Sequence, residues 1–453
     1  MTITGSLAQL LTRTSFEELP PLAVDHAAML ISSTIASAAA GCGIASSRII
    51  RDLAKEQGGT SESSIWFDGG SKVPAVNAAR VNALMSDAAA SDDSDLRGIV
   101  HTGTTVAATS LALGERTGAS GREVLAAMVL GYEIAGRINE AVVPAWKQRG
   151  FHGSTLAIFG GAVASGRLLK LNAQQMAQAI ALASVSMGSL AVAAETSVAR
   201  EYFAGNAAMQ GVNAALAAHK GLFGEESVLE AEKGFFDIYG GENIDDVTRG
   251  WGREWDIITD MAIKLVPGGQ PNHALAEAAV NAAREGNVAA DEVESITIAQ
   301  PLGGKIGIKP LRPPTHPKDL IGMAHTPSYF VAAGVADKDY SWVHASEKKI
   351  HDPVIHQLID KIRIGAPITQ NVERFKQGGT VTIKLKDGRS YTSTVYAPRG
   401  SGARGIDWAD VDHKYRTLVA MAKLDARKIE DSIKVIHGFR DARSVSELTS
   451  FLR

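Results

Sequence analysis

The sequence predicts a mainly α-helical protein, in which a large helical domain carries a smaller inserted α+β domain. Three observations support this fold class. The first half of the chain is rich in Ala, Gly and Ser and has periodic apolar positions, a pattern typical of helices that cross closely through small side chains. Residues 293–299 and 380–395 instead alternate between apolar and polar side chains, as strands do. From Asp407 onward the apolar spacing is helical again.

These changes of pattern divide the 453 residues into three segments. We expect residues 1–255 to form the first part of the helical domain, residues 256–398 to form the α+β domain, and residues 399–453 to return to the helical domain. Asp387 and Gly388 lie between two alternating runs and predict a β-hairpin with a type I′ turn.

Composition excludes several classes of protein. The 46 Lys and Arg residues against 49 Asp and Glu residues give a net charge of −3, so no basic excess draws the chain to nucleic acid or to an anionic membrane. The single cysteine, Cys42, excludes an internal disulfide and a cysteine-based metal cluster. The N-terminus has neither a basic head nor a long apolar run, so we expect no signal peptide, no membrane anchor and a cytoplasmic location. Residues 171–194 are uncharged and long enough to cross a membrane, but their amides and hydroxyls favour a buried core helix.

Motifs for common cofactors are missing from the sequence. No phosphate-binding loop ending in Gly-Lys-Ser/Thr, no His-Glu-x-x-His pair and no Cys-x-x-Cys pair occurs. One Gly-x-Gly-x-x-Gly pattern, residues 400–405, follows a hairpin instead of opening a βαβ unit, which favours an inter-domain loop over a dinucleotide site. We therefore expect no metal and no cofactor.

The first polar cluster that could carry chemistry surrounds His101. Asp92 and Asp93 precede this histidine, and Thr102 and Thr104 follow it, between two Ala-rich stretches. The cluster is either a solvated loop that caps the next helix through a threonine, or an acid/base histidine oriented by a carboxylate.

Two further clusters lie at the expected starts of helices. His152 comes directly before a helix that has only Gly, Ala and Ser along one face. The free N–H groups at the N-terminus of that helix would favour a carboxylate; a plain capped core helix is the alternative. Arg200 lies at the start of a helix that has small residues along one face and ends near Gly221. The planar guanidinium of Arg200 could hold a carboxylate with two hydrogen bonds. A solvated surface arginine is the alternative there.

The last two clusters fall in the α+β segment. Lys264 and His273 bracket a segment that we expect to run from the end of a strand to the start of a helix, and Tyr329 follows further along. For each residue a buried structural histidine or a packed tyrosine is the alternative to a catalytic group.

Taken in this order, the five clusters resemble the MmgE/PrpD family, and the likeness spans nearly the whole chain. The most specific stretches are residues 131–134, 151–155, 205–211, 221–224 and 232–236. The family includes 2-methylcitrate dehydratase, cis-aconitate decarboxylase and iminodisuccinate epimerase. The resemblance implies a helical domain with an α+β lid domain, a homodimer, a small-molecule polycarboxylate as substrate, and no required cofactor.

The resemblance also assigns roles to individual residues. It implies that the catalytic acid/base groups come from His101, His152, Lys264 and Tyr329. Substrate-binding candidates are the acidic motif and other polar residues beside these positions, namely Asp92, Asp93, Thr102, Arg200 and His273.

Three positions depart from the pattern of the family's dehydratases and decarboxylases. Ala90 stands where they carry an Asp, Arg200 where they carry a Lys, and Gly269 where a His or Cys is frequent. Removal of a proton next to a carboxylate needs a base together with cations or N–H groups that stabilise the resulting negative charge. Dehydration or decarboxylation needs an additional acid, whereas epimerisation needs only a base and an acid on opposite faces of one carbon. We therefore predict an epimerase of an iminodisuccinate-like polycarboxylate; the alternatives are a 2-methylcitrate-type dehydratase or related lyase, and a non-catalytic carboxylate-binding helical protein.

Overall fold

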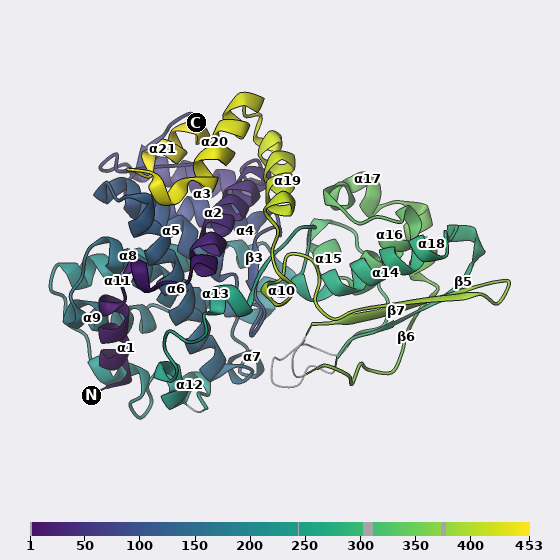
Figure 1. Cartoon of the computed structure of the whole chain (residues 1–453), viewed down its shortest axis with the longest axis horizontal. Coiled ribbons are helices and arrows are strands. Elements are labelled where there is room, and N and C mark those ends of the chain that lie inside the picture. The colour runs from purple at the N-terminus through teal and green to yellow at the C-terminus, as the bar shows by residue number, and fades with distance from the viewer. Residues whose placement is uncertain (1, 243, 302–310, 373–376) are drawn as a thin grey trace. The chain divides into compact units, whose positions relative to one another are not determined.

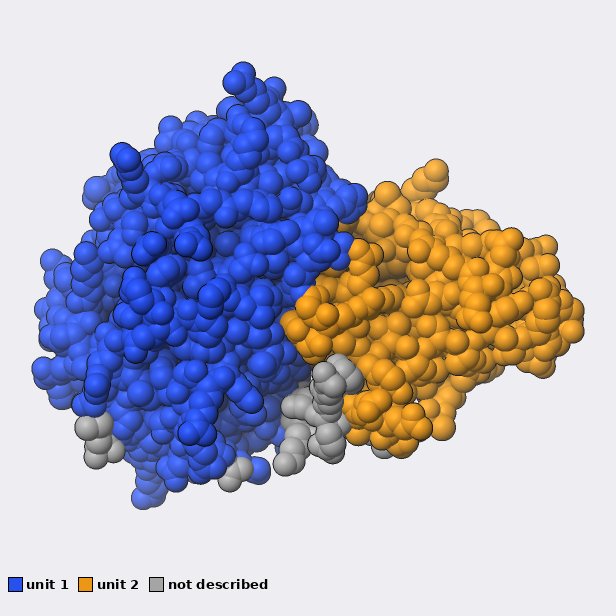
Figure 2. Space-filling model, viewed as in Figure 1, with its two compact units in different colours: residues 1–263, 406–453 blue, residues 264–405 orange. Residues whose placement is uncertain are grey.

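The computed structural model describes residues 2–242, 244–301, 311–372 and 377–453, and its elements are shown in Figure 1. The chain divides into two compact units (Figure 2). Unit 1 contains Met1–Ile263 and Ile406–Arg453, and unit 2 contains Lys264–Gly405. The sequence pattern placed the corresponding boundaries after residues 255 and 398. Helices predominate in the described chain, which confirms the predicted mainly α class.

Unit 1 is a helical body with two short strand pairs. Its helices are α1 (Ile3–Arg13), α2 (Pro21–Gly41), α3 (Ala45–Gln57), α4 (Ala75–Ala88), α5 (Thr102–Thr117), α6 (Gly121–Val142), α7 (Ala145–Gln148), α8 (Ala157–Leu168), α9 (Ala173–Ser184), α10 (Ala191–Thr196), α11 (Ala199–His219), α12 (Phe235–Tyr239), α13 (Asp256–Thr259), α19 (Trp408–Val419), α20 (Ala426–His437) and α21 (Ser446–Thr449). The antiparallel pairs are β1 (Ser63–Ser64) with β2 (Lys72–Val73), and β3 (Asp93–Asp95) with β4 (Met261–Ile263).

Small residues lie where the helices of unit 1 cross, as the composition predicted. Gly131 of α6 and Gly160 of α8 face each other so closely that a Cβ atom added to either would lie 2.7 Å from the other residue's carbonyl oxygen. A Cβ on Gly211 of α11 would lie 2.9 Å from the backbone nitrogen of Ala162 in α8. The backbones of α6, α8 and α11 therefore touch where any larger side chain would separate them.

The C-terminal end of α2 gives a direct test of this packing. A Cβ on Gly41 would lie 1.9 Å from the carbonyl oxygen of Met85 in α4. We expect Gly41→Ala to lower the free energy of unfolding by about 1–3 kcal/mol, because α2 and α4 must move apart. Urea unfolding of the purified variant measures the effect. Gly43→Ala is the matched control, since a Cβ there meets no atom within 4 Å; equal stability of the two variants would contradict the packing argument.

One helix of the described chain is long and apolar enough to cross a membrane, and it is α2. In its most apolar 18-residue window, 83% is buried inside the molecule, where α2 packs on α4 and α19.

The uncharged stretch 171–194 is not the single core helix that we expected. It contains α9 and the start of α10, separated by a loop. The Ser189 hydroxyl in this loop donates to the carbonyl oxygen of His152 at 2.8 Å, and the Gly188 N–H donates to the Thr155 hydroxyl at 3.3 Å. The polar groups of the stretch therefore interrupt the helix to bind a neighbouring segment.

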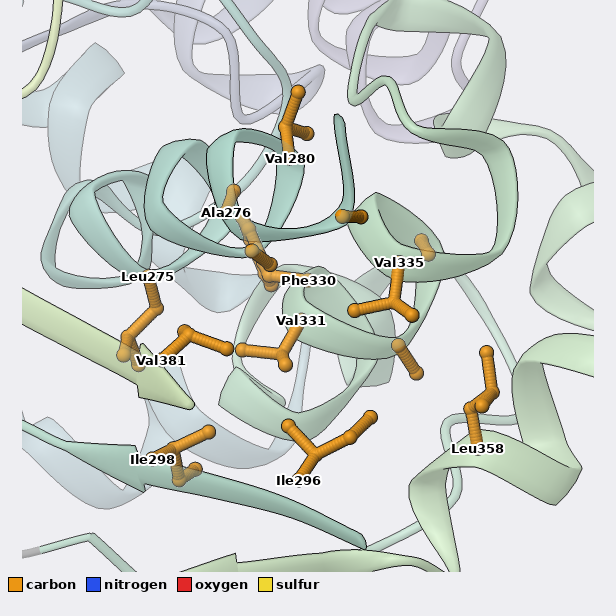
Figure 3. Close-up of a cluster of buried hydrophobic side chains, with 14 of the residues drawn as sticks. Leu275, Ala276, Val280, Ile296, Ile298, Phe330, Val331, Val335, Leu358 and Val381 are labelled. Carbon is orange, nitrogen blue, oxygen red and sulfur yellow. The ribbon is translucent and has the colours of Figure 1, made fainter. Parts of the chain in front are cut away.

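Unit 2 packs helices against a four-stranded sheet. Its helices are α14 (His273–Glu285), α15 (Leu320–Ala324), α16 (Pro327–Asp337), α17 (Glu347–Ile350) and α18 (Pro353–Ile359). Its strands are β5 (Val293–Ala299), β6 (Ile362–Ile364), β7 (Gly379–Leu385) and β8 (Ser390–Val395), in the order β6-β5-β7-β8, with only the β5–β6 pair parallel. Leu275 and Val331 of the helices meet Ile296, Ile298 and Val381 of the strands in its core (Figure 3). The alternation in residues 293–299 and 380–395 thus predicted β5, β7 and β8 correctly, whereas β6 was not predicted.

The turn between β7 and β8 differs from the predicted type. The Gly388 N–H donates to the Leu385 carbonyl at 3.0 Å, and the Leu385 N–H donates to the Arg389 carbonyl at 2.9 Å. Gly388 has a φ of +89°, whereas Asp387 is not among the positive-φ residues. A type I′ turn needs positive φ at both central positions, so this is a three-residue loop with a glycine bulge.

Candidate functional site

The acidic segment before α5 is buried, so the alternative of a solvated loop is wrong. Asp92, Asp93 and Asp95 are each at most 1% exposed. β3 pairs with β4 so that Asp93 lies opposite Ile263. His101, 8% exposed, is the N-cap residue of α5. The strand pair therefore holds the acidic residues beside the N-terminus of α5.

The Asp93 carboxylate binds the N-terminus of α5. It accepts hydrogen bonds from the N–H groups of Gly103 at 2.8 Å and Thr104 at 3.0 Å, and from the Tyr132 hydroxyl at 3.4 Å. Burial and the charge of Asp92 raise the pKa of Asp93 to about 6. Both carboxylate oxygens accept hydrogen bonds within the protein, and Asp93 stays a prediction as a substrate-binding residue. It is a positioning group that fixes the start of the helix carrying His101.

His101 forms a dyad with Asp92. Its Nδ1 lies 2.8 Å from Asp92 Oδ2 and 2.8 Å from the carbonyl oxygen of Asp93. The Thr104 hydroxyl donates to the same Asp92 oxygen at 3.2 Å. Because a carbonyl oxygen can only accept, Nδ1 carries a hydrogen in this arrangement. In the neutral ring, Nε2 is then the basic nitrogen, and the Asp92 carboxylate stabilises the charge that the ring gains when it takes a proton.

Arg200 is paired with a carboxylate from another helix. Its Nε donates to Asp87 Oδ2 at 3.0 Å and its Nη2 donates to the Asp87 carbonyl at 2.8 Å. The Arg200 side chain is 14% exposed, so the alternative of a solvated surface arginine is wrong. Burial would lower the pKa of Arg200, but the charges of Asp87 and Asp92 outweigh it and raise that pKa. The guanidinium is a fixed positive charge beside the dyad.

Asp87, Asp92 and His101 could hold a metal ion by geometry alone. One ligand atom from each lies within 4.8 Å of the others. No metal-ligand spacing is visible in the sequence here, because residues 87, 92 and 101 come together only through packing. Asp87 is ion-paired with Arg200, and Asp92 is hydrogen-bonded to His101, so both carboxylates already have partners within the protein.

A second set of carboxylates lies around Arg97, next to β3. Arg97 binds Asp256 at 2.6 Å and Asp260 at 3.0 Å. Burial and the charge of Asp260 raise the pKa of Asp95 to about 7. Burial likewise raises the pKa of Glu133, whose carboxylate accepts the Asp256 N–H at 2.8 Å. These carboxylates thus surround Arg97 next to β3.

His152 has the opposite tautomer to His101. It is the N-cap residue of a 3₁₀ turn (Gly153–Leu156) that leads into α8, and its Nδ1 accepts the Ser154 N–H at 3.3 Å. In the neutral ring, the hydrogen is then on Nε2. The His152 ring also contacts the Phe203 ring, with centroids 5.8 Å apart. The imidazole thus accepts the Ser154 N–H, one of the groups that we expected to bind a substrate carboxylate at this helix N-terminus.

The first turns of α11 connect the two histidines. Arg200 contacts Asp87 beside the His101 dyad, and Phe203, three residues later, contacts His152. Residues three apart lie on one face of a helix, so this face of α11 brings both histidines to one region of unit 1.

Thr102, Lys264 and His273 are predicted site residues that the structure places in buried surroundings. Thr102, the first residue of α5, is fully buried, and its hydroxyl has no hydrogen-bond partner among the described residues. Lys264, 2% exposed, directly follows β4 and begins unit 2. His273 begins α14 and its Nε2 lies 3.3 Å from the Gly268 carbonyl. These three positions stay predictions as site residues.

Tyr329, which we expected to be an acid/base group, lies in the hydrophobic core of unit 2. It is fully buried in the core of unit 2, and its hydroxyl donates to the His344 carbonyl at 2.8 Å. Burial and the charge of Asp337 raise the pKa of Tyr329. In this structure the hydroxyl is a buried structural group, so we leave it out of the proposed chemistry below.

Sequence reasoning missed two residues of α4 and one of α6. Asp87 and Arg80 are the charged residues of α4, and both are buried. An isolated charge in an Ala-rich helix was the available signal, because burying a charge requires a partner. Tyr132 fell within a stretch that the family resemblance used, but nothing local linked it to Asp93.

Comparison with known proteins identifies the family. The model of the MmgE/PrpD N-terminal domain matches residues 5–246, and that of the MmgE/PrpD C-terminal domain matches residues 269–437. The chain therefore belongs to the MmgE/PrpD family, as the motifs predicted.

Its curated relatives include several cis-aconitate decarboxylases. The chain is 25% identical to the enzyme of Homo sapiens over 343 residues, covering 74% of this chain and 69% of the human protein. It is 24% identical to the Mus musculus enzyme over 417 residues, covering 89% and 84%. It is 26% identical to the Aspergillus terreus enzyme over 414 residues, covering 84% and 82%. This likeness supports an enzyme with lyase-type chemistry, and gives no support to the epimerase branch that we predicted.

Proposed function

We propose that this protein is a cofactor-independent lyase that acts on a small polycarboxylate at a carbon next to a carboxylate. The observation that carries the proposal is the Asp92–His101 dyad, buried at the N-terminus of α5 with the charge of Arg200 beside it. The likeness to cis-aconitate decarboxylases supports this substrate class.

The proposed chemistry uses the two histidines in different roles. In a dehydration, His101 Nε2 takes the proton from the carbon next to the carboxylate, the electron pair forms the new double bond, and hydroxide leaves as water with a proton from an acid. In a decarboxylation, the bond to the carboxylate carbon breaks, carbon dioxide leaves, and an acid protonates the remaining carbanion. The Nε2–H of His152 suits a hydrogen bond to the substrate, and Arg200 suits stabilisation of the negative charge.

The experiment is incubation with cis-aconitate, 2-methylcitrate and related polycarboxylates in D₂O. We expect loss of carbon dioxide or water, together with deuterium at the protonated carbon in the decarboxylation case. Proton NMR and carbon dioxide release follow both events. A protein that neither forms product nor exchanges hydrogen with any of these compounds would support the non-catalytic alternative and contradict the proposal.

A second candidate function is epimerisation of an iminodisuccinate-like polycarboxylate. The specific observation in its favour is that His101 presents a basic nitrogen, and that epimerisation needs only this base and one acid on the opposite face of the carbon. Ala90 and Gly269, where related lyases carry polar residues, favour it as well. In the same experiment, deuterium incorporation with inverted configuration and no loss of water or carbon dioxide would identify it. The homodimer implied by the resemblance and the cytoplasmic location remain predictions.

Chelation tests the role of the three possible metal ligands. We expect turnover to be unchanged after dialysis against EDTA, because Asp87 and Asp92 are already paired with Arg200 and His101. The measurement is turnover before and after dialysis, with metal content determined on the same samples. Activity that is lost and then restored by a divalent ion would instead assign Asp87, Asp92 and His101 to a metal centre.

A further inference from the structure

Arg80 of α4 is a buried arginine without an acidic partner. It is 7% exposed, and within the described residues its guanidinium donates no hydrogen bond and forms no ion pair. Its Nε is fully buried and unpartnered. The contact that the guanidinium makes is with the ring of Tyr202, whose centroid is 5.2 Å away. A cation over an aromatic ring is stabilised only in part, because the buried Nε–H still lacks an acceptor among the described residues.

Other largely buried arginines of unit 1 show what Arg80 lacks. Each of them is satisfied by carboxylates or carbonyl oxygens: Arg97 by Asp256 and Asp260, Arg137 by Glu133, Arg167 by the carbonyls of Leu11, Thr12 and Thr14, and Arg200 by Asp87. A buried charge without a partner destabilises the protein that contains it. Arg80 is therefore placed for an anion that the chain itself does not provide.

The position of Arg80 links it to the candidate site. Arg80 precedes Asp87 by seven residues on α4, which is two turns and a rise of about 10 Å on nearly the same helix face. Its partner ring, Tyr202, follows Arg200 by two residues on α11. The Arg80–Tyr202 and Asp87–Arg200 contacts thus both join α4 to α11. In this interface between α4 and α11, Arg200 already binds a carboxylate of the protein, whereas Arg80 binds none among the described residues.

We propose that Arg80 binds a carboxylate group of a small polycarboxylate ligand. The proposal deepens the proposed function, on which it rests for the class of ligand. The planar guanidinium can hold a carboxylate through two parallel N–H···O bonds. Tyr202, itself 43% exposed, covers the guanidinium and forms the outer wall of this subsite. A ligand with two or three carboxylates would be held by Arg80 at a distance from the reacting carbon near His101.

The test is direct binding of tricarballylate, a saturated tricarboxylate on which no dehydration or decarboxylation is expected. Isothermal titration calorimetry compares the wild-type protein with Arg80→Met and Arg122→Met. Arg122 is the matched control because it also lies 5.2 Å from a ring centroid, that of Phe16, but it is 51% exposed and has Glu17 nearby at 3.6 Å. We expect Arg80→Met to weaken binding at least tenfold, and Arg122→Met to leave it unchanged.

Thermal unfolding without ligand separates binding from a structural role. Arg80→Met removes a buried N–H donor that has no acceptor among the described residues, so we expect its melting temperature to equal or exceed that of the wild type, while the rise caused by tricarballylate is lost. Arg80→Lys keeps the charge without the planar donors and should recover part of the affinity.

Four results would overturn the proposal: wild-type affinity in Arg80→Met, no binding of tricarballylate to the wild type, a melting temperature lowered by Arg80→Met alone, or a change of oligomeric state in that variant. The last would assign Arg80 to a contact between subunits. Failure of the proposed function has a different signature, because the calorimetry needs no turnover. Binding that depends on Arg80 without any product would keep the subsite and reject the lyase. Turnover with an unchanged KM in Arg80→Met would keep the lyase and reject the subsite.

Discussion

Replacing His101 with glutamine is expected to lower kcat by about 10²–10⁴-fold, with a smaller change in KM. His101 is the side chain whose contacts define a base: Nδ1 is held by Asp92 and by the carbonyl of Asp93, both at 2.8 Å, which makes Nε2 the basic nitrogen of the neutral ring. Removing a positioned proton-transfer group typically costs this factor in rate. Glutamine keeps a polar side chain of similar reach, so the packing at the start of α5 changes little.

Asp92→Asn separates the role of the dyad from that of the imidazole alone. The amide can donate to Nδ1 and so favour the wrong tautomer, and we expect a loss of kcat and a displaced pH profile. His437→Gln is the control for loss of a histidine paired with an aspartate, because His437 Nε2 lies 3.0 Å from Asp412 Oδ1 on α20 and α19. Wild-type kcat in His101→Gln, measured by product formation, would show that the base lies elsewhere.

Arg200→Ala is expected to raise KM strongly, by an amount equivalent to about 2–5 kcal/mol of binding free energy. The guanidinium uses Nε and Nη2 for Asp87, and its Nη1 donates no hydrogen bond to the described residues. That group is therefore a donor suited to a substrate carboxylate beside the dyad. Steady-state kinetics give KM and kcat separately, and a saturated polycarboxylate gives the affinity without turnover.

A double variant distinguishes substrate binding from neutralisation of Asp87. Arg200→Ala leaves the Asp87 carboxylate buried without its partner, which by itself disturbs the site. If Arg200 only neutralises Asp87, the double variant with Asp87→Ala recovers KM; if Arg200 binds substrate, KM stays high. Arg200→Lys, which restores the residue type of the family pattern, should keep most of the charge and lose the two-bond grip. Recovery in the double variant would refute the substrate-binding role.

Local pattern predicted much of the fold, because secondary structure follows from residues a few positions apart. The alternating residues 293–299 form β5, and the buried side chains of this strand lie in the core of unit 2. The small residues of the first half became close helix contacts such as Gly131 against Gly160. The same method failed for residues 171–194, where apolar composition suggested one helix. Hydrogen bonds from Ser189 and Gly188 to a segment about 35 residues away break that stretch in two.

The sequence by itself determined the fold class, the family and the positions of His101, His152 and Arg200 at the starts of helices. Tertiary structure alone decided what these residues do there. It placed the Asp93 carboxylate on the N-terminus of α5, and it buried Tyr329 in the core of unit 2. It also joined Arg200 to Asp87, 113 residues away, and left the Nε–H of Arg80, on the same helix as Asp87, without an acceptor among the described residues. The physical reason is that the charge and tautomer of a buried group depend on the partners that packing supplies, and those partners come from helices far apart in the chain.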